Sequence, residues 1–136
     1  MFTKEQRSKF PYWFAHWCAY NMTALNLGHW RFRYLFHDIE KPWLRLFLPY
    51  EKVQKFHRNH APHHQEFFLK HGWLRWDDMI IDWECSRFTK EAAKWDANDV
   101  RPLEIEKLYK FNPTEEQVKE FTEKTEQALI ELGLKK

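Results

Sequence analysis

The stretch WDDMIIDW, residues 76–83, carries the clearest fold signal in this chain of 136 residues. Four of its apolar residues recur at the i, i+3, i+4 and i+7 spacing of one helix face: Trp76, Met79, Ile80 and Trp83. The pattern predicts a long central helix over about residues 73–95. A chain of this length is the size of one ordinary domain, and we expect a single domain over residues 1–136.

Glycine and proline residues divide the rest of the chain into further helices. We expect these helices over about residues 10–27, 29–40, 51–60 and 62–72. Residues 96–102 are expected to form a connector, and Asn112-Pro113 begins an amphipathic C-terminal helix over about residues 113–134. The sequence has no strand pattern and only three Gly. The expected fold is therefore all-α, a bundle of five to seven helices.

Composition narrows the class of protein. The formal net charge is only +2, so a nucleic-acid or anionic-membrane partner is not required. The two cysteines, Cys18 and Cys85, form no CxxC pair, which favours a reducing compartment. No apolar run approaches 18 residues, so we expect no membrane span and a cytoplasmic protein.

Histidines are concentrated in one part of the chain. Seven of the eight lie between His29 and His71, and four of them lie at His57, His60, His63 and His64. Four protonated imidazoles so close together would repel one another, and a metal would hold them neutral. Which of the four bind metal stays open, because His57, His60 and His64 share a helix face only if Pro62 does not break the helix. If Pro62 starts a helix, His63 and His64 occupy its first turn, where the helix dipole favours the neutral ring.

A second group of polar residues is His37-Asp38-Ile39-Glu40-Lys41, expected at the end of a helix. There His37 and Asp38 can turn toward one point. Imidazole and carboxylate together suit Zn, Fe, Mn or Co, and a carboxylate can bridge two ions. Lys41 could bind a phosphate oxygen, or could serve as a solvated cation at a helix C-terminus. Arg33, just upstream, is a further candidate for phosphate binding, with an exposed surface position as the alternative.

Two more candidate ligands lie on helices at either end of this region. His16 is on the first expected helix, among aromatic residues, and could be either a ligand or a core histidine. Asp82 borders the apolar stripe of the central helix. A carboxylate facing a core needs a partner, and a metal is one such partner. Asp78, one turn earlier, competes for this role, and we favour Asp82.

The order of these residues resembles the H…HD…D pattern of the HD-domain metal-dependent phosphohydrolases, through His16, His37-Asp38 and Asp82. The segments HDIEK, NHAPHH and DW are most similar to small uncharacterised HD-like proteins of bacteria and phages. The resemblance covers about residues 10–95, the expected metal-binding core. It implies that Asp38 bridges two ions. The ligands that it implies for the first ion are His16, His37, Asp38 and Asp82, and for the second His60, His63 and His64.

The resemblance implies a hydrolase that uses two divalent ions, Mn, Fe, Co or Zn, to activate water, with Asp38 and Lys41 as catalytic residues. The expected substrate is a nucleotide or another small phosphoester. Glu40 stands where the cyclic-dinucleotide phosphodiesterases of this superfamily have Gly in HDxGK, which disfavours cyclic dinucleotides. One alternative function is a di-iron oxygenase of the same superfamily. The other is a non-catalytic, metal-containing protein that binds a ligand or a partner.

Overall fold

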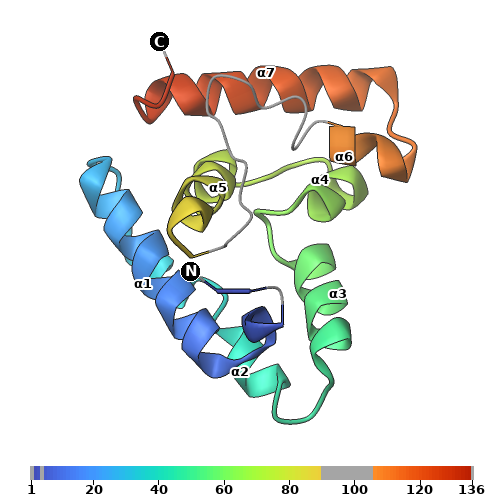
Figure 1. The fold of residues 1–136 in the computed structure, drawn as a ribbon. Helices are drawn as coiled ribbons and strands as arrows, with labels where there is room; N and C mark the ends of the chain where they lie inside the picture. The colour runs from blue at the N-terminus through green and yellow to red at the C-terminus, as the bar shows by residue number, and fades with distance from the viewer. Residues whose placement is uncertain (1, 4, 90–105, 136) are drawn as a thin grey trace.

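The chain folds into helices in the computed structural model, which describes residues 2–3, 5–89 and 106–135 (Figure 1). The α-helices are α1 (Phe10–Asn26), α2 (Glu40–Leu44), α3 (Tyr50–His60), α4 (Gln65–His71), α5 (Trp76–Thr89), α6 (Glu106–Leu108) and α7 (Glu115–Glu131). Short 3-10 turns are η1 (Gln6–Ser8), η2 (Phe32–Phe36) and η4 (Tyr109–Phe111). Over these residues there is no strand, so the predicted all-α class is confirmed. None of the helices described is both long and apolar enough to cross a membrane.

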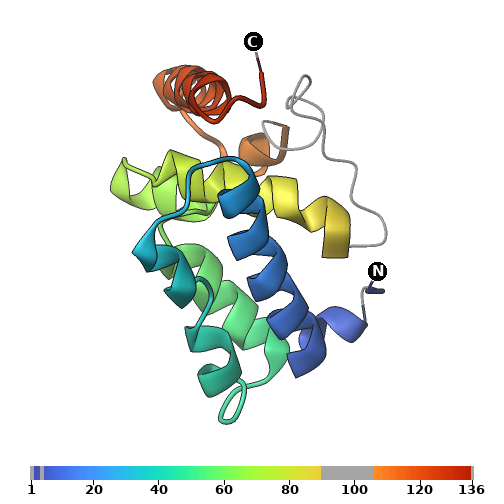
Figure 2. The same cartoon turned by 90° about the vertical axis from the view of Figure 1, so that its left-hand side faces the viewer.

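Helix α5 is the centre of the core. Four of its side chains are completely buried: Met79, Ile80, Ile81 and Cys85. The three consecutive residues Met79, Ile80 and Ile81 point to different sides of the helix, so the helix must be covered on several sides. Helix α1 and helix α7 both pack on it, on different sides (Figures 1 and 2). The predicted central helix is confirmed over residues 76–89, whereas residues 90–95 and the expected connector 96–102 lie outside the described residues.

The C-terminal helix α7 closes the core, as its apolar pattern predicts. Its N-cap is Thr114, which forms a capping box with Gln117. The cap thus lies two residues after the expected Asn112, which adopts a left-handed conformation at φ 51° and ends the preceding turn. The buried residues on the inner side of the helix and its C-cap are Phe121, Thr125, Ala128, Leu129 and Leu132.

Helix α1 has the expected bounds because both ends carry local signals. Pro11 lies in its first turn, where a missing backbone N–H costs no hydrogen bond. The helix ends at Asn26, and Gly28 follows with φ 68°. A left-handed residue at this place is a common helix terminator, and glycine adopts it without strain.

The expected helix over residues 29–40 is wrong. Residues 32–36 form the 3-10 turn η2, His37 is extended, and Asp38 has a positive φ of 55°. Helix α2 then begins at Glu40 and contains Pro42 within its first turn. Because proline is tolerated in a first turn, Pro42 does not end a helix here but follows the start of one.

The expected helix start at Pro62 is also wrong. Helix α4 begins at Gln65 with His64 as its N-cap residue, in an extended conformation. His63 and His64 therefore lie in the connection between α3 and α4, not in a first helical turn. The expected stop is confirmed, because Gly72 ends α4 with φ 79°.

A charged cluster fixes η2 to the start of α5. The carboxylate of Asp77 accepts hydrogen bonds at Oδ2 from Arg33 (2.8 Å), Tyr34 (2.9 Å) and His29 (2.9 Å). Arg33 also donates to Asp78 Oδ1 at 2.7 Å. Both carboxylates lie in the first turn of α5, where the helix dipole favours negative charge. The cluster holds the segment after α1 against the central helix.

We predict that Asp77→Asn lowers stability more at neutral pH than in acid. Burial alone would raise the pKa of Asp77, but His29, Tyr34 and Arg33 outweigh it and lower this pKa from 3.8 to about 2. A lowered folded-state pKa stabilises the fold above pH 4, and this contribution disappears as the pH falls toward 2. The side chain is 23% exposed, so we expect a loss of about 1–2 kcal/mol at pH 7. Urea denaturation at pH 7 and at pH 2.5 measures the loss in free energy of unfolding, with a precision of about 0.5 kcal/mol. An equal loss at both pH values would contradict the prediction.

Candidate metal centre

Side chains of α1 hold the segment that precedes α2. Three donors spaced four residues apart on one face of α1 bond to backbone carbonyl oxygens of this segment. The pairs are Trp13 Nε1 to Asp38 (2.8 Å), Trp17 Nε1 to Leu35 (2.9 Å) and Asn21 Nδ2 to Tyr34 (3.2 Å). The Trp17 bond gives the Leu35 carbonyl a partner, and the other two bonds add a second donor to carbonyl groups that already accept the backbone N–H of Lys41 and of His37. Together the three bonds fix the segment in which the helical structure is broken.

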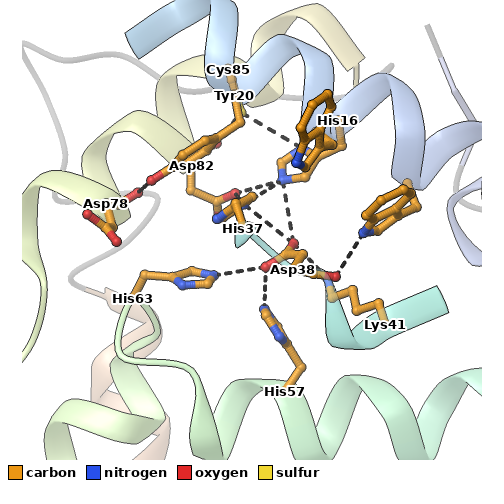
Figure 3. Close-up of polar contacts among 12 residues, drawn as sticks. His16, Tyr20, His37, Asp38, Lys41, His57, His63, Asp78, Asp82 and Cys85 are labelled. Carbon is orange, nitrogen blue, oxygen red and sulfur yellow. Dashed lines mark hydrogen bonds and ion pairs between the residues drawn. The ribbon is translucent and has the colours of Figure 1, made fainter. Parts of the chain in front are cut away.

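Asp38 lies at the centre of the site (Figure 3). Its positive φ is uncommon outside glycine, although Asp tolerates it better than most residues, and it costs about 1–3 kcal/mol. Next to it, His37 is also buried. The change of backbone direction between these neighbours brings both side chains into one cluster, which a regular helix would not allow.

The first group of candidate ligands surrounds Asp38 Oδ2. His16 Nε2, from α1, lies 2.8 Å from Asp82 Oδ1, from α5, and 3.2 Å from His37 Nε2. Asp38 Oδ2 is 3.7 Å from His16 Nε2 and 3.5 Å from His37 Nε2. In a tetrahedral site with bonds of about 2.1 Å, ligand atoms are about 3.4 Å apart. The spacing of these four side chains therefore fits one metal ion.

The second group surrounds the other oxygen of the same carboxylate. Asp38 Oδ1 is 3.0 Å from His57 Nε2 and 3.3 Å from His63 Nε2. His57, His63 and His64 also have nitrogen atoms within 4.8 Å of one another. Asp38 Oδ1 and the Nε2 atoms of the three histidines are buried. Oδ1 lies at ion-pair distance from His57 and His63, but none of the four atoms forms a hydrogen bond of good geometry with a described residue. Buried polar atoms without hydrogen bonds are costly, and a metal ion would satisfy all four.

Two neighbours orient the histidines. Glu40 bonds to Nδ1 of His57, which directs the opposite ring nitrogen toward Asp38. A carboxylate on the far nitrogen is the usual support of a metal-binding histidine. Tyr20 stacks on His37 with ring centroids 3.7 Å apart and holds the plane of that imidazole.

Lys41 places a cation at the edge of the site. Its Nζ lies 3.2 Å from Asp38 Oδ2. Burial alone would lower the pKa of Lys41, but Asp38 and Asp82 outweigh this effect and raise it. Lys41 is therefore protonated at neutral pH and can donate to an anion beside the carboxylate.

Burial and neighbouring charges together set the protonation of the ligands. In His57, burial alone would lower the pKa, but Asp38 and Glu40 outweigh it and raise this pKa. Burial lowers the pKa of His37 to about 4 and holds the pKa of His64 well below its usual value. Burial would raise the pKa of Asp38 and Asp82, but in both residues the surrounding basic groups outweigh it and hold the pKa well below normal. At neutral pH the site thus offers neutral His37 and His64 and ionised carboxylates, the forms that bind metal ions.

The structure brings together most of the residues that the sequence singled out. These are His16, His37, Asp38, Lys41, His63, His64 and Asp82. It does not bring His60 or Arg33 into either ligand group. Arg33 is paired with Asp77 and Asp78. Asp78 is therefore held by Arg33, whereas Asp82 belongs to the first group.

Two residues that the sequence prediction did not include belong to the site. His57, which the sequence left open, replaces His60, and Glu40 orients it. Val53 and His57, four residues apart, are both buried on the inner face of α3. His60 is the last residue of α3, is exposed, and has Nδ1 2.8 Å from the carbonyl oxygen of Phe56. Sequence spacing alone does not separate the two histidines, because His57 follows Val53 by four residues and His60 follows Phe56 by four.

Three cavities are lined by residues of the centre. A cavity of about 1050 Å³, called here the large cavity, is lined at its inner end by His16, Asp38, His64 and Asp82. A smaller cavity of about 350 Å³ is lined by residues that include His37, Asp38, His57 and His63. Asp38 borders all three. A small molecule could therefore approach the candidate ligands from the large cavity without unfolding any helix.

Comparisons with protein-family models, with curated proteins and with solved structures each find no match for this chain. Within the described residues, buried histidine and aspartate side chains form groups that could hold a metal ion.

We predict that His57→Ala lowers metal content and that His60→Ala does not. Removing His57 should lower metal affinity by about 10–100-fold or more, since it deletes one candidate ligand and leaves Glu40 without its partner. Removing His60 should leave metal content unchanged. Inductively coupled plasma mass spectrometry of the purified variants after dialysis measures both. Equal loss in the two variants, with circular dichroism showing both folded, would contradict the assignment.

Proposed function

We propose that this chain is a metal-dependent phosphohydrolase with an HD-domain-like fold, which uses two divalent ions. The observation that carries the proposal is that the two oxygen atoms of the Asp38 carboxylate face different groups of candidate ligands. Its Oδ2 atom faces His16 and His37, and its Oδ1 atom faces His57 and His63. A carboxylate with each oxygen directed at a separate ligand group is suited to bridge two ions about 3.5–4 Å apart.

The two ligand groups differ in composition. His16, His37 and Asp82 accompany Oδ2, and His57, His63 and His64 accompany Oδ1. Imidazole and carboxylate ligands suit Mn, Fe, Co or Zn. The sequence-based ligand assignment for the second ion changes accordingly, with His57 in place of His60.

Each residue of the site would have a separate role in hydrolysis. When bound, a pair of divalent ions acidifies water and neutralises charge on a phosphoryl group. Asp38 and the histidines fix the geometry, and Glu40 fixes His57. In the reaction the water oxygen bonds to phosphorus, the bond from phosphorus to the leaving oxygen breaks, and one proton passes from water to that oxygen or to solvent. Lys41, which lines the large cavity, would donate to a phosphoryl oxygen as negative charge develops on it.

The substrate proposed is a small phosphoester that enters through the large cavity. A nucleotide remains the substrate class implied by the resemblance of the HDIEK and NHAPHH segments to HD-type enzymes. Arg33 is not needed in this scheme, because its guanidinium is already held by Asp77 and Asp78.

We predict that Asp38→Asn reduces both metal content and turnover. Asn tolerates a left-handed backbone, so the variant should fold, as Asn112 at φ 51° in the same chain illustrates. An amide cannot supply the charge that a bridging carboxylate gives to two ions. We expect at most one ion per chain and a loss of phosphatase activity of at least about 100-fold. Metal analysis and a screen of p-nitrophenyl phosphate and nucleotides with Mn, Co and Zn measure the two effects.

Two outcomes of these measurements would contradict the proposal. One is unchanged metal content in Asp38→Asn. The other is a wild-type protein that holds iron tightly, shows a visible absorption band and hydrolyses none of the phosphoesters. The second result would favour the oxygenase function.

We predict that Lys41→Met separates binding of metal from turnover. Methionine keeps most of the apolar length of the side chain but removes the ammonium group beside Asp38. Metal content should stay at the wild-type level, while kcat falls by about 100–1000-fold, the usual cost of removing one donor to developing charge. Steady-state kinetics with p-nitrophenyl phosphate, at saturating metal, test this expectation. Full activity of the variant would exclude Lys41 from the mechanism.

A further inference from the structure

The large cavity extends well beyond the candidate metal ligands. Its volume of about 1050 Å³ is at the upper end of the range for small-molecule sites, far more than one phosphate group occupies. Beyond Lys41 its walls are formed by parts of η1, α3 and α4. These walls would contact whatever part of a substrate lies next to the reacting phosphate.

Helix α3 gives its polar face to this cavity. The lining residues follow the helical spacing i, i+3, i+4, i+7 and i+8: Glu51, Gln54, Lys55, Arg58 and Asn59. The opposite face carries the buried Val53 and His57. Because Arg58 directly follows His57, the helix that supplies a candidate ligand also supplies a cation to the adjoining wall.

Four cations on the cavity walls, beyond Lys41, have no carboxylate partner among the described residues. Lys55 and Arg58 on α3, Lys70 on α4 and Arg7 on η1 all line it, and none forms a salt bridge with any residue for which the structure gives a position. The Nε atom of Arg7 is buried and has no hydrogen-bond partner in the described part of the chain. A buried guanidinium nitrogen without a partner is costly, and an anion in the cavity would satisfy it.

We propose that the substrate of this site carries a second phosphate group beside the one that is hydrolysed. This inference rests on the proposed phosphohydrolase function and specifies its substrate class, a small phosphoanhydride or bisphosphate. Lys55 and Arg58, one helical turn apart, bind the second phosphate. Arg7 and Lys70 approach it from the walls formed by η1 and α4. Arginine binds phosphate through paired N–H groups, and lysine binds it as a compact charge.

The acidic residues of the cavity agree with this assignment. Outside the ligand groups they are Glu51 and Glu66, fewer than the cations on the same walls. A substrate with one phosphate would leave the α3 cations facing solvent. A substrate with two would place one anion at the metal groups and Lys41, and the other at Lys55 and Arg58.

Binding of two inert phosphonates tests the inference without requiring turnover. Methylphosphonate carries one phosphonate group and methylenediphosphonate carries two. With the metal-containing protein, isothermal titration calorimetry should give methylenediphosphonate at least about tenfold tighter binding than methylphosphonate. The double variant Lys55→Ala/Arg58→Ala should lose this preference and keep its affinity for methylphosphonate. Alanine favours the helix at both positions, so α3 should persist.

The matched control is Lys52→Ala, an exposed lysine of α3 outside the residues that line the large cavity. It should retain the full preference. Equal binding of the two phosphonates by the wild type, or an unchanged preference in the double variant, would overturn the inference and leave the phosphohydrolase proposal intact. Failure of both phosphonates to bind, together with no phosphomonoester hydrolysis, would overturn both.

Discussion

An ionised carboxylate, that of Asp38, is buried where side chains from α1, α3 and α5 converge. Burying such a charge costs several kcal/mol unless nearby groups compensate for it. Here His57 and Lys41 lie within about 3.2 Å of its oxygens, and His63 lies at 3.3 Å. The positive φ of Asp38 adds a further cost. Both costs are tolerated because the surrounding helices fix the residue in this conformation.

Helices α1 and α5 both form the core and carry residues of the site. Tyr20 on α1 is completely buried, and its ring holds His37. His16 lies one turn before Tyr20 and contacts Asp82 of α5. Ligands on packed helices hold their positions better than ligands on loops. Two segments of the site are irregular: the one around His37 and Asp38, and the connection between α3 and α4 that carries His63 and His64. Helix α1 fixes the first of these through the indole of Trp13.

Local signals predicted α1, α3 and α7, because their caps, breakers and apolar stripes lie within the helices themselves. They did not predict the break at residues 29–40. That break depends on Trp13 and Trp17 of α1, whose indoles bond to carbonyl groups 25 and 18 residues away. No window of sequence around Asp38 contains this information, and Pro42 suggested a helix end where the chain has a helix start.

The candidate ligands were likewise predictable only in part from the local sequence. Residue type and order indicated His16, His37, Asp38 and Asp82, which the structure brings within one group. The choice among the clustered histidines depended on where α3 ends. Because α3 runs to His60, its inner face presents His57 and turns His60 outward.

The access to the centre bears on whether its metal would be structural or catalytic. Structural metal sites are closed, with every coordination position taken by the protein. Here Asp38 borders three cavities, and the large one also reaches His16, His64 and Asp82. Neutral imidazoles and two carboxylates would leave a pair of divalent ions with excess positive charge. Lys41 adds to that charge at the cavity, so the open side of the centre favours an anion.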